Sequence, residues 1–215
     1  MSELVVYGVG TSRTLRAHWV LAELGLSYRT EPIQSRSGQT TTAEYTKLDP
    51  RQKVPVLTDG DFVLSETVAI VTYLAEHYAS PDKQLVPTSM KQRARYNEWV
   101  SFVCMELDAT SLYVLRRHEG LPEIYGVAPE ASKVARDYFT KMIDAAAVRF
   151  DHEHEYLLGQ EFTGADIFMM TVLAWAKRLH IPLPAVFGNY HDRICNRPAY
   201  QAALIANTPS GLLAA

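Results

Sequence analysis

Lys53-Val54-Pro55-Val56-Leu57 is the stretch that decides the fold. Val56 and Leu57 predict a buried strand, although the proline in front of them cannot donate to a sheet ladder. A proline at this place indicates a turn into an edge strand, and a cis Val54–Pro55 bond is one way to build that turn. The turn leaves the N–H and C=O of Val54 facing outward, where an extended peptide can pair with them.

Ser65-Glu66-Thr67 follows this strand and opens a segment of helical periodicity. The first backbone N–H groups of a helix have no partner within the helix, and they attract anions. The sequence therefore places a backbone edge near a helix N-terminus. That combination suits a small, charged, peptide-like ligand.

Strand and helix signals alternate along the first part of the chain. They run in the order strand 4–7, helix 12–26, strand 28–33, hairpin 56–58 with 62–64, and helix 68–78. Gly8-Val9-Gly10 ends the first strand, Gly25 is a candidate C-cap, and residues 34–46 predict a polar loop with room for one short helix. A strand–helix–strand start predicts a parallel pair. The expected order is βαβ followed by ββα.

Residues 80–88 are a composition break, beyond which the strand signals stop. Helical periodicity then returns in the segments 89–118, 134–142, 166–179 and 192–206. Segment 166–179 is apolar on nearly every side and should be central, and Arg197-Pro198 causes a local break in the last helix. We therefore predict a mixed α/β domain over 1–79, a linker over 80–88 and an all-α helical bundle over 89–215.

The composition is that of a soluble globular protein, with 47% hydrophobic and 21% charged residues. A formal net charge of −3 gives no support for binding to nucleic acid or to acidic membranes. Residues 1–7 lack a signal-peptide pattern, and no apolar run approaches the length of a membrane span. Cys104 and Cys195 lack CxxC spacing, and His152-Glu153-His154-Glu155 lacks the spacing of a helical metal site. We expect a cytoplasmic protein without a metal.

The βαβ-ββα order with a proline opening the third strand resembles a thioredoxin-like domain. With a helical domain behind it, the whole chain resembles a bacterial cytosolic glutathione transferase of the serine-type, theta-, delta- or nu-like branch. Residues 48–57 resemble that family's loop into a cis-proline, and residues 64–70 resemble its glutamyl-binding helix start, with Thr67 where serine is commoner. Residues 162–167 resemble the capping box of the bundle's core helix, in which Asp166 is structural.

The resemblance implies a hydroxyl at the start of the first helix, beside the glutathione sulfur. Ser12, four residues before Arg16, matches the catalytic position of serine-type members, while Thr11 and Tyr7 are the alternatives. A free thiol with a pKa near 8.5 is only about 3% thiolate at pH 7. A hydroxyl donor and the field of a helix N-terminus stabilise the anion. Because no cysteine precedes Cys104, the cysteine-type branch is disfavoured.

The resemblance also implies a set of glutathione-binding residues: Gln52, Lys53, Val54, Pro55, Glu66 and Thr67. Val54 is expected to exchange two backbone hydrogen bonds with the cysteinyl residue. Glu66 is expected to hold the γ-glutamyl ammonium and Thr67 its carboxylate. Gln52 and Lys53 are placed to meet the glycine carboxylate.

The expected activity is conjugation of the glutathione thiolate, as co-substrate, to an electrophilic and largely apolar small molecule. The resemblance implies an acceptor pocket between the domains, lined by Val9, Gly10, Phe102, Glu106 and Tyr113, and a homodimer. A glutathione-dependent isomerase, dehalogenase or peroxidase on the same fold is one alternative. A non-catalytic binding protein is the other, and it is disfavoured because a pure scaffold need not keep all the ligand motifs.

Overall fold

The computed structural model describes residues 3–209 of the 215-residue chain. The chain divides into two compact units that do not follow sequence order. The first comprises Met1–Val86 together with Cys195–Ala215, and the second comprises Pro87–Ile194. The last helix of the chain therefore belongs to the same unit as the sheet.

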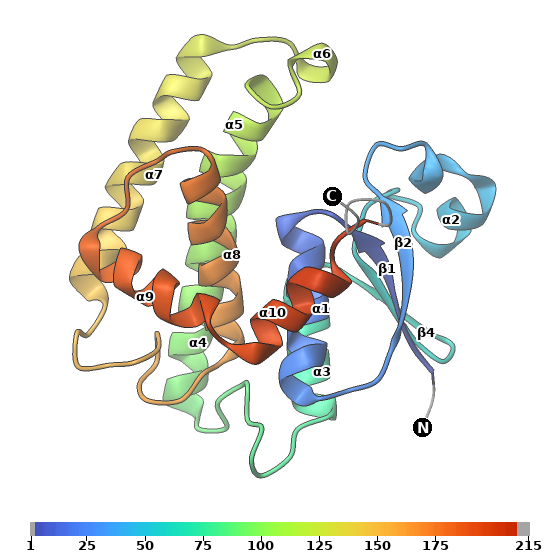
Figure 1. Ribbon diagram of the computed structural model, residues 1–215, viewed down its shortest axis with the longest axis horizontal. Coiled ribbons are helices and arrows are strands. Elements are labelled where there is room, and N and C mark those ends of the chain that lie inside the picture. Colours follow the sequence, from blue (N-terminus) through green and yellow to red (C-terminus); the bar gives the residue numbers. More distant parts are fainter. Residues whose placement is uncertain (1–2, 210–215) are drawn as a thin grey trace. The chain divides into compact units, whose positions relative to one another are not determined.

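The first unit is a four-stranded mixed sheet with helices on its faces. Its elements are β1 (Leu4–Val9), α1 (Ser12–Leu24), β2 (Arg29–Gln34), η1 (Gln39–Thr41), α2 (Ala43–Leu48), β3 (Val56–Asp59), β4 (Phe62–Ser65), α3 (Thr67–His77) and α10 (Pro198–Ala206). The strand order is β2-β1-β3-β4, with β1 and β2 parallel and the other pairs antiparallel. Helices α1 and α3 cover one face, and α2 lies on the other side (Figure 1). The predicted thioredoxin-like βαβ-ββα order is confirmed.

The expectation that Pro55 opens an edge strand was wrong. Strand β3 is interior, because it pairs with β1 on one side and with β4 on the other. The ladder begins at Val56, opposite Tyr7 and Ser65, so Pro55 lies outside it and its missing N–H removes no ladder bond. The Val54–Pro55 bond is cis.

Helix α10 packs against α1, which explains why the end of the chain belongs to the first unit. The rings of Trp19 and Tyr200 lie 4.7 Å apart between centroids. The guanidinium of Arg197 donates two hydrogen bonds to the Glu23 carboxylate, at 2.9 and 2.8 Å, and the Trp19 indole donates a third at 2.9 Å. The Glu23 side chain is nearly buried, so this paired charge is satisfied from both helices.

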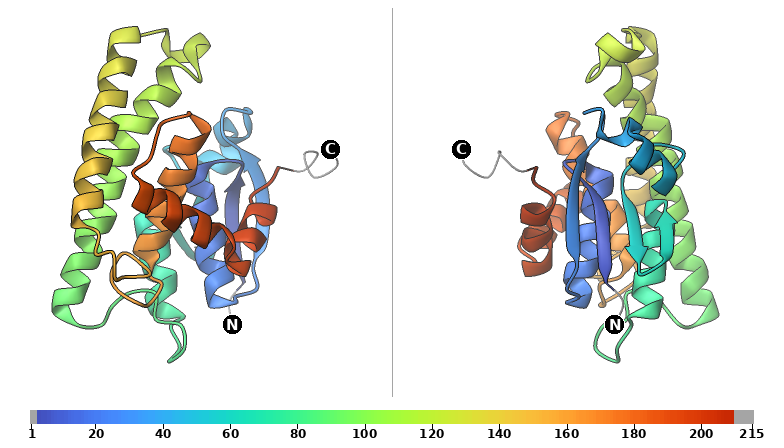
Figure 2. Two further views of the ribbon diagram at one scale, coloured as in Figure 1. Left: turned by 60° about the vertical axis from the view of Figure 1, so that its left-hand side comes forward. Right: turned by 90° about the vertical axis from the view of Figure 1, so that its right-hand side faces the viewer.

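The second unit is helical, as the bundle prediction required. Its elements are α4 (Met90–Phe102), η2 (Val103–Leu112), α5 (Tyr113–His118), α6 (Pro122–Tyr125), α7 (Pro129–Arg149), α8 (Gly164–Arg178) and α9 (Ala185–Cys195). The segment from α4 to α5 lies side by side with α7 (Figure 2). The predicted helix over 89–118 is continuous, but its middle part, η2, is π-helical. There the Ser111 hydroxyl donates to the carbonyl of Glu106, five residues earlier, at 2.6 Å.

Helix α8 is the buried centre of the second unit, as its uniform apolarity predicted. It begins with the predicted capping box, in which the Asp166 carboxylate accepts from the N–H and the hydroxyl of Thr163. Asp166 also accepts from the N–H of Leu157 at 2.9 Å and from the Tyr190 hydroxyl at 2.6 Å. Four donors therefore satisfy one fully buried carboxylate, which is a structural role.

The end of the chain differs from the single helix expected over 192–206. Helix α9 begins earlier, at Ala185, and ends at Cys195, and Pro198 is the first residue of α10. Within residues 3–209, no helix has the length and apolar composition needed to cross a membrane.

Candidate functional site

The start of α1 brings two hydroxyl candidates together but gives them different tasks. Thr11 is the N-cap, and its Oγ1 accepts from the N–H of Thr14 at 3.0 Å. The N–H of Thr11 donates in turn to Oγ1 of Thr14, which completes a capping box. Ser12 is the first helical residue and is 9% exposed. The helix cap therefore uses the Thr11 hydroxyl, and Ser12 is the residue after the N-cap.

Tyr7, the third candidate, lies within β1. It is half-buried, opposite Glu31 of β2 and Val56 of β3. Which of Tyr7, Thr11 and Ser12 serves the sulfur stays a prediction.

Val54 packs directly on the end of β1, at Gly8. A Cβ added to Gly8 would lie 2.7 Å from the Val54 Cβ and 2.8 Å from Cγ2 of Thr14. Only glycine allows this approach, and its φ of +131° is one that other residues rarely adopt. Val54 and the first turn of α1 therefore meet at Gly8.

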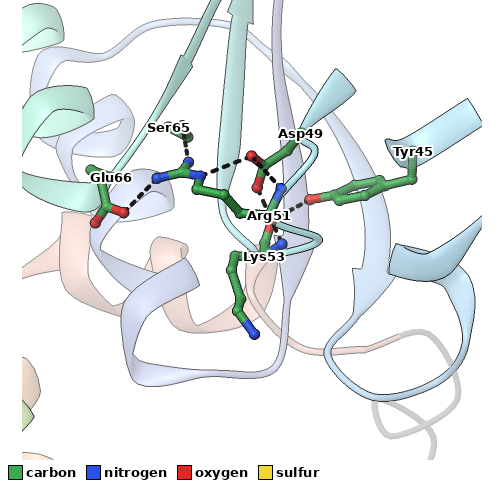
Figure 3. A network of polar contacts seen from close by, with 6 residues as sticks. All are labelled: Tyr45, Asp49, Arg51, Lys53, Ser65 and Glu66. Carbon is green, nitrogen blue, oxygen red and sulfur yellow. Dashed lines mark hydrogen bonds and ion pairs between the residues drawn. The ribbon is translucent and has the colours of Figure 1, made fainter. Parts of the chain in front are cut away.

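Asp49 and Tyr45 organise the loop that ends in Val54. The Asp49 carboxylate accepts from the N–H of Lys53 at 3.1 Å, and the Tyr45 hydroxyl donates to the carbonyl of Lys53 at 2.6 Å (Figure 3). Burial raises the pKa of Tyr45, so its hydroxyl stays a donor. Gln52 has a φ of +56° and donates from Nε2 to Thr46 at 3.1 Å. Within residues 3–209, the main chain of Val54 makes no hydrogen bond and is open to a peptide-like ligand.

Glu66 and Thr67 lie at the start of α3, as predicted. Glu66 has a φ of +71°, and its side chain is 76% exposed. Thr67 is buried, and its hydroxyl accepts from the buried Arg16 guanidinium at 3.4 Å. Thr14 of α1 and Val54 thus both lie against Gly8, and Arg16 of α1 contacts Thr67. The grouping of Ser12, Val54 and Thr67 in one site stays a prediction.

Asn207, which follows α10, is a positioning residue that sequence reasoning missed. Its Oδ1 accepts from the Thr14 hydroxyl at 2.6 Å and from the N–H of Gly10 at 3.2 Å. Its Nδ2 donates to the carbonyl of Thr11 at 3.1 Å, and its own carbonyl accepts from Gly10 at 2.8 Å. No sequence signal links residues almost 200 positions apart.

His18 of α1 contacts the end of β1, just before the same turn. Nε2 lies 2.9 Å from the carbonyl of Gly8, and Nδ1 lies 2.9 Å from the Tyr28 hydroxyl. Because a carbonyl can only accept, Nε2 carries the proton, and Nδ1 accepts from Tyr28. Burial lowers the pKa of His18, so the neutral form is favoured.

The predicted acceptor-pocket residues belong to both units. Val9 and Gly10 lie at the end of β1, beside the turn that Asn207 holds. Phe102, Glu106 and Tyr113 follow one another along α4, η2 and α5 of the second unit. Their membership of one pocket stays a prediction.

Each of the three second-unit residues has a partner within the bundle. The Phe102 ring packs edge-on against Trp99, and the Glu106 carboxylate accepts from the Tyr138 hydroxyl. The Arg117 guanidinium lies 4.9 Å from the centroid of the Tyr113 ring.

A cavity of about 470 Å³ in the second unit contains none of the predicted site residues. It is lined by His118, Glu119, Val127, Ala128, Pro129, Ser132, Lys133 and Arg136. In the part of the chain that the structure describes, no three His, Cys, Asp or Glu residues are grouped to hold a metal ion. Helix α7 ends at Arg149, so His152 and His154 lie in the loop after it.

The buried neutral His18 predicts that stability falls in acid. Its folded-state pKa lies below the ordinary 6.5, so the unfolded chain takes up a proton first as the pH falls. Stability is therefore fully present above pH 6.5 and decreases below it, by at most about 1.4 kcal/mol per pH unit for this group. Urea unfolding at several pH values should show a shallower acid decline for His18→Gln than for the wild type. The exposed control His152→Gln should keep the wild-type slope, and equal slopes for all three proteins would contradict the assignment.

The Asn207 contacts predict that this side chain stabilises the turn before α1. Asn207→Ala should lower the free energy of unfolding by about 1–3 kcal/mol, because it removes the side-chain hydrogen bonds to the Thr14 hydroxyl and the Thr11 carbonyl, while Gly10 keeps the Asn207 carbonyl. Gln201→Ala on α10 is the matched control, since its amide donates only to the exposed carbonyl of Cys195. Urea unfolding checks both variants. An equal loss of unfolding free energy in the two variants would show that the Asn207 side-chain contacts make no specific contribution to stability.

Two family models match this chain: the N-terminal domain of glutathione S-transferases over residues 2–76 and the C-terminal domain over residues 63–198. A glutathione S-transferase of Triticum aestivum is 29% identical, with 95% of this chain and 94% of that protein covered. Glutathione S-transferase 2 of Anopheles gambiae is 32% identical over 74% of this chain and 71% of its own length.

A solved structure, the theta class glutathione S-transferase of the citrus canker pathogen Xanthomonas axonopodis pv. citri with glutathione bound, matches with a TM-score of 0.78. It is 25% identical, and the match covers 95% of this chain and 98% of that one. The chain belongs to the glutathione S-transferase family, as its Val54-Pro55 and Glu66-Thr67 motifs predicted.

Proposed function

We propose that this protein transfers the thiolate of glutathione to an electrophilic, largely apolar small molecule, and that Ser12 stabilises the thiolate. The observation that carries the proposal is the convergence on the start of α1. Ser12 is the first residue of that helix, Thr14 and Val54 both pack against Gly8, and Arg16 contacts Thr67. A tripeptide held by Val54 and Thr67 has its sulfur near Ser12.

The open main chain of Val54 supports the placement of the cysteinyl residue. Its N–H and C=O can add one extended residue to the end of β3, as in strand addition. Because Tyr45 and Asp49 already engage the backbone of Lys53, Val54 presents its peptide groups without reorganisation. This order lowers the entropic cost of binding.

The start of α1 supports the chemistry at the sulfur. N–H groups of a helix's first turn carry partial positive charge, and a serine hydroxyl adds a donor aimed at an anion. Each unit by which the thiol pKa falls corresponds to about 1.4 kcal/mol of preferential stabilisation of the thiolate. The resulting thiolate attacks the electrophilic carbon of the acceptor. A C–S bond forms as the bond from that carbon to its leaving group breaks, and the leaving group departs as an anion with the electron pair.

The two ends of glutathione have separate partners in the proposal. Glu66 takes the γ-glutamyl ammonium, while the hydroxyl and N–H of Thr67 take its carboxylate. Gln52 and Lys53 meet the glycine carboxylate. Lys53 suits this role because its ammonium is exposed and points away from the Asp49 and Arg51 contacts (Figure 3).

The exposed apolar side chains on β4 and α3 support a homodimer. Phe62, Val63 and Val68 are 48%, 45% and 39% exposed. Strand β4 is also an edge strand, and an open apolar edge of this kind is usually covered by a partner. We also propose a cytoplasmic location, which agrees with Cys104 and Cys195 being reduced, with no disulfide between them.

Sedimentation tests the dimer. The wild type should sediment at twice the chain mass of 24.2 kDa, and Phe62→Glu should shift the population toward the monomer, because it places a charge in the apolar contact. Val148→Glu is the control, since it introduces the same charge at an exposed apolar position on α7. A wild type that sediments as a monomer throughout would refute the dimer.

Retention on immobilised glutathione and turnover of a generic aromatic electrophile test the function. The wild type should be retained and active. Ser12→Ala should still bind glutathione but lose roughly 10- to 30-fold in rate at pH 7, because the glutathione thiol in this variant returns to about 3% ionisation at that pH. The rate should recover as the pH rises toward 8.5.

Thr11→Ala and Tyr7→Phe are the matched controls for this assignment. If Ser12→Ala keeps the wild-type rate and either control loses activity instead, the catalytic assignment moves to that residue. A wild type that neither binds glutathione nor turns over would refute the proposed function.

A further inference from the structure

Arg51 joins the loop before Val54 to the start of α3, and no sequence motif singled it out. Its Nε donates to Oδ1 of Asp49 at 3.0 Å, and one Nη donates to Oε1 of Glu66 at 2.7 Å. The other Nη donates to the Ser65 hydroxyl. Figure 3 shows the guanidinium lying between Asp49 on one side and Ser65 and Glu66 on the other.

Asp49 is the anchor that holds this guanidinium. It is 4% exposed and also accepts from the N–H of Arg51 and of Lys53. Burial alone would raise the pKa of Asp49, but the hydrogen bonds from the Arg51 side chain and from these two N–H groups outweigh it and lower the pKa. Asp49 is therefore ionised at neutral pH, and it orients Arg51 before any ligand arrives.

Glu66 depends on Arg51 for its position. Its side chain is exposed and packs against little, and within the described residues its carboxylate is held by Arg51. An exposed ion pair is usually worth little, because two long side chains lose freedom to form it. Here the buried Asp49 already restrains one partner, so the pair is preorganised.

The pair sets a positive group beside a negative group, where the γ-glutamyl end of the ligand is expected. A guanidinium carries five N–H donors, and three of them serve Asp49, Glu66 and Ser65. The two that remain can donate to a carboxylate. An α-amino acid zwitterion, with its ammonium and carboxylate on one carbon, is complementary to this arrangement.

We propose that Arg51 is a further binding residue, which donates to the α-carboxylate of the γ-glutamyl residue while Glu66 accepts from its ammonium. The inference rests on the proposed function and narrows its thiol substrate to peptides that carry a free α-amino acid zwitterion. Arg51 also offsets the repulsion between the ligand carboxylate and Glu66. A ligand that lacks the α-carboxylate gains no direct hydrogen bond from Arg51.

Three ligands and three variants test the assignment by calorimetry. The ligands are glutathione, γ-aminobutyryl-Cys-Gly, which lacks the α-carboxylate, and glutaryl-Cys-Gly, which lacks the ammonium. The variants are Arg51→Gln, Arg51→Lys and the matched control Arg29→Gln, which removes an exposed arginine that pairs with Glu3 and Glu31.

Wild type and Arg29→Gln should bind glutathione about 10-fold or more tightly than γ-aminobutyryl-Cys-Gly. Arg51→Gln should bind glutathione more than 10-fold less tightly. Its binding of γ-aminobutyryl-Cys-Gly should weaken much less, because that ligand loses only the support that Arg51 gives to Glu66, so the preference for the α-carboxylate disappears. Arg51→Lys keeps the positive charge but lacks the planar guanidinium with its paired donors. It should therefore keep part of the preference that Arg51→Gln loses. If Arg51→Gln does not fold, the comparison of Arg51→Lys with the wild type tests the proposal.

Two outcomes would overturn the Arg51 assignment while leaving the proposed function intact. One is a wild-type preference for the α-carboxylate that survives in both Arg51 variants. The other is a preference lost only against glutaryl-Cys-Gly, which would mean that Arg51 acts solely by holding Glu66. A wild type that binds none of the three ligands would instead refute the proposed function, and the Arg51 role with it.

Discussion

The close approach of the end of β1 to Val54 is the constraint on which the first unit depends. Gly8 lies so near Val54 and Thr14 that a single added carbon would fall within 2.8 Å of both. This contact brings the open peptide of Val54 next to the first turn of α1. The placement of Ser12 relative to Val54 therefore depends on the absence of one side chain, and a rigid element positions a functional group better than a mobile loop.

The end of β1 and the turn after it are restrained by two further residues. His18 holds the carbonyl of Gly8 from within α1, and Asn207 holds Gly10, Thr11 and Thr14 from the segment after α10. Asn207 is held near this turn because Arg197 and Tyr200, at the start of α10, contact Glu23 and Trp19 of α1. The end of the chain is thus part of the support of the candidate site, and the first unit is built from two distant pieces of sequence.

Local chemistry was predictable from the sequence, whereas contacts that join distant segments were not. The cis bond at Pro55, the C-cap at Gly25 and the capping box at Asp166 each depend on a few neighbouring residues, and all three were confirmed. The edge position of β3 was wrong because strand order depends on all the other strands. Arg51 and Asn207 were missed because their partners, Glu66 and Thr14, become visible only in three dimensions.

The charges of the site follow from which part of the ligand must react. A thiolate paired with a full positive charge would be a weaker nucleophile, so dipoles and hydroxyls at the start of α1 suit the sulfur better than a lysine or an arginine would. The γ-glutamyl end takes no part in bond formation, and full charges such as Arg51 and Glu66 can hold it firmly. Binding energy from this unreactive end then serves to orient the sulfur, which raises the rate at a distance from the reacting atoms.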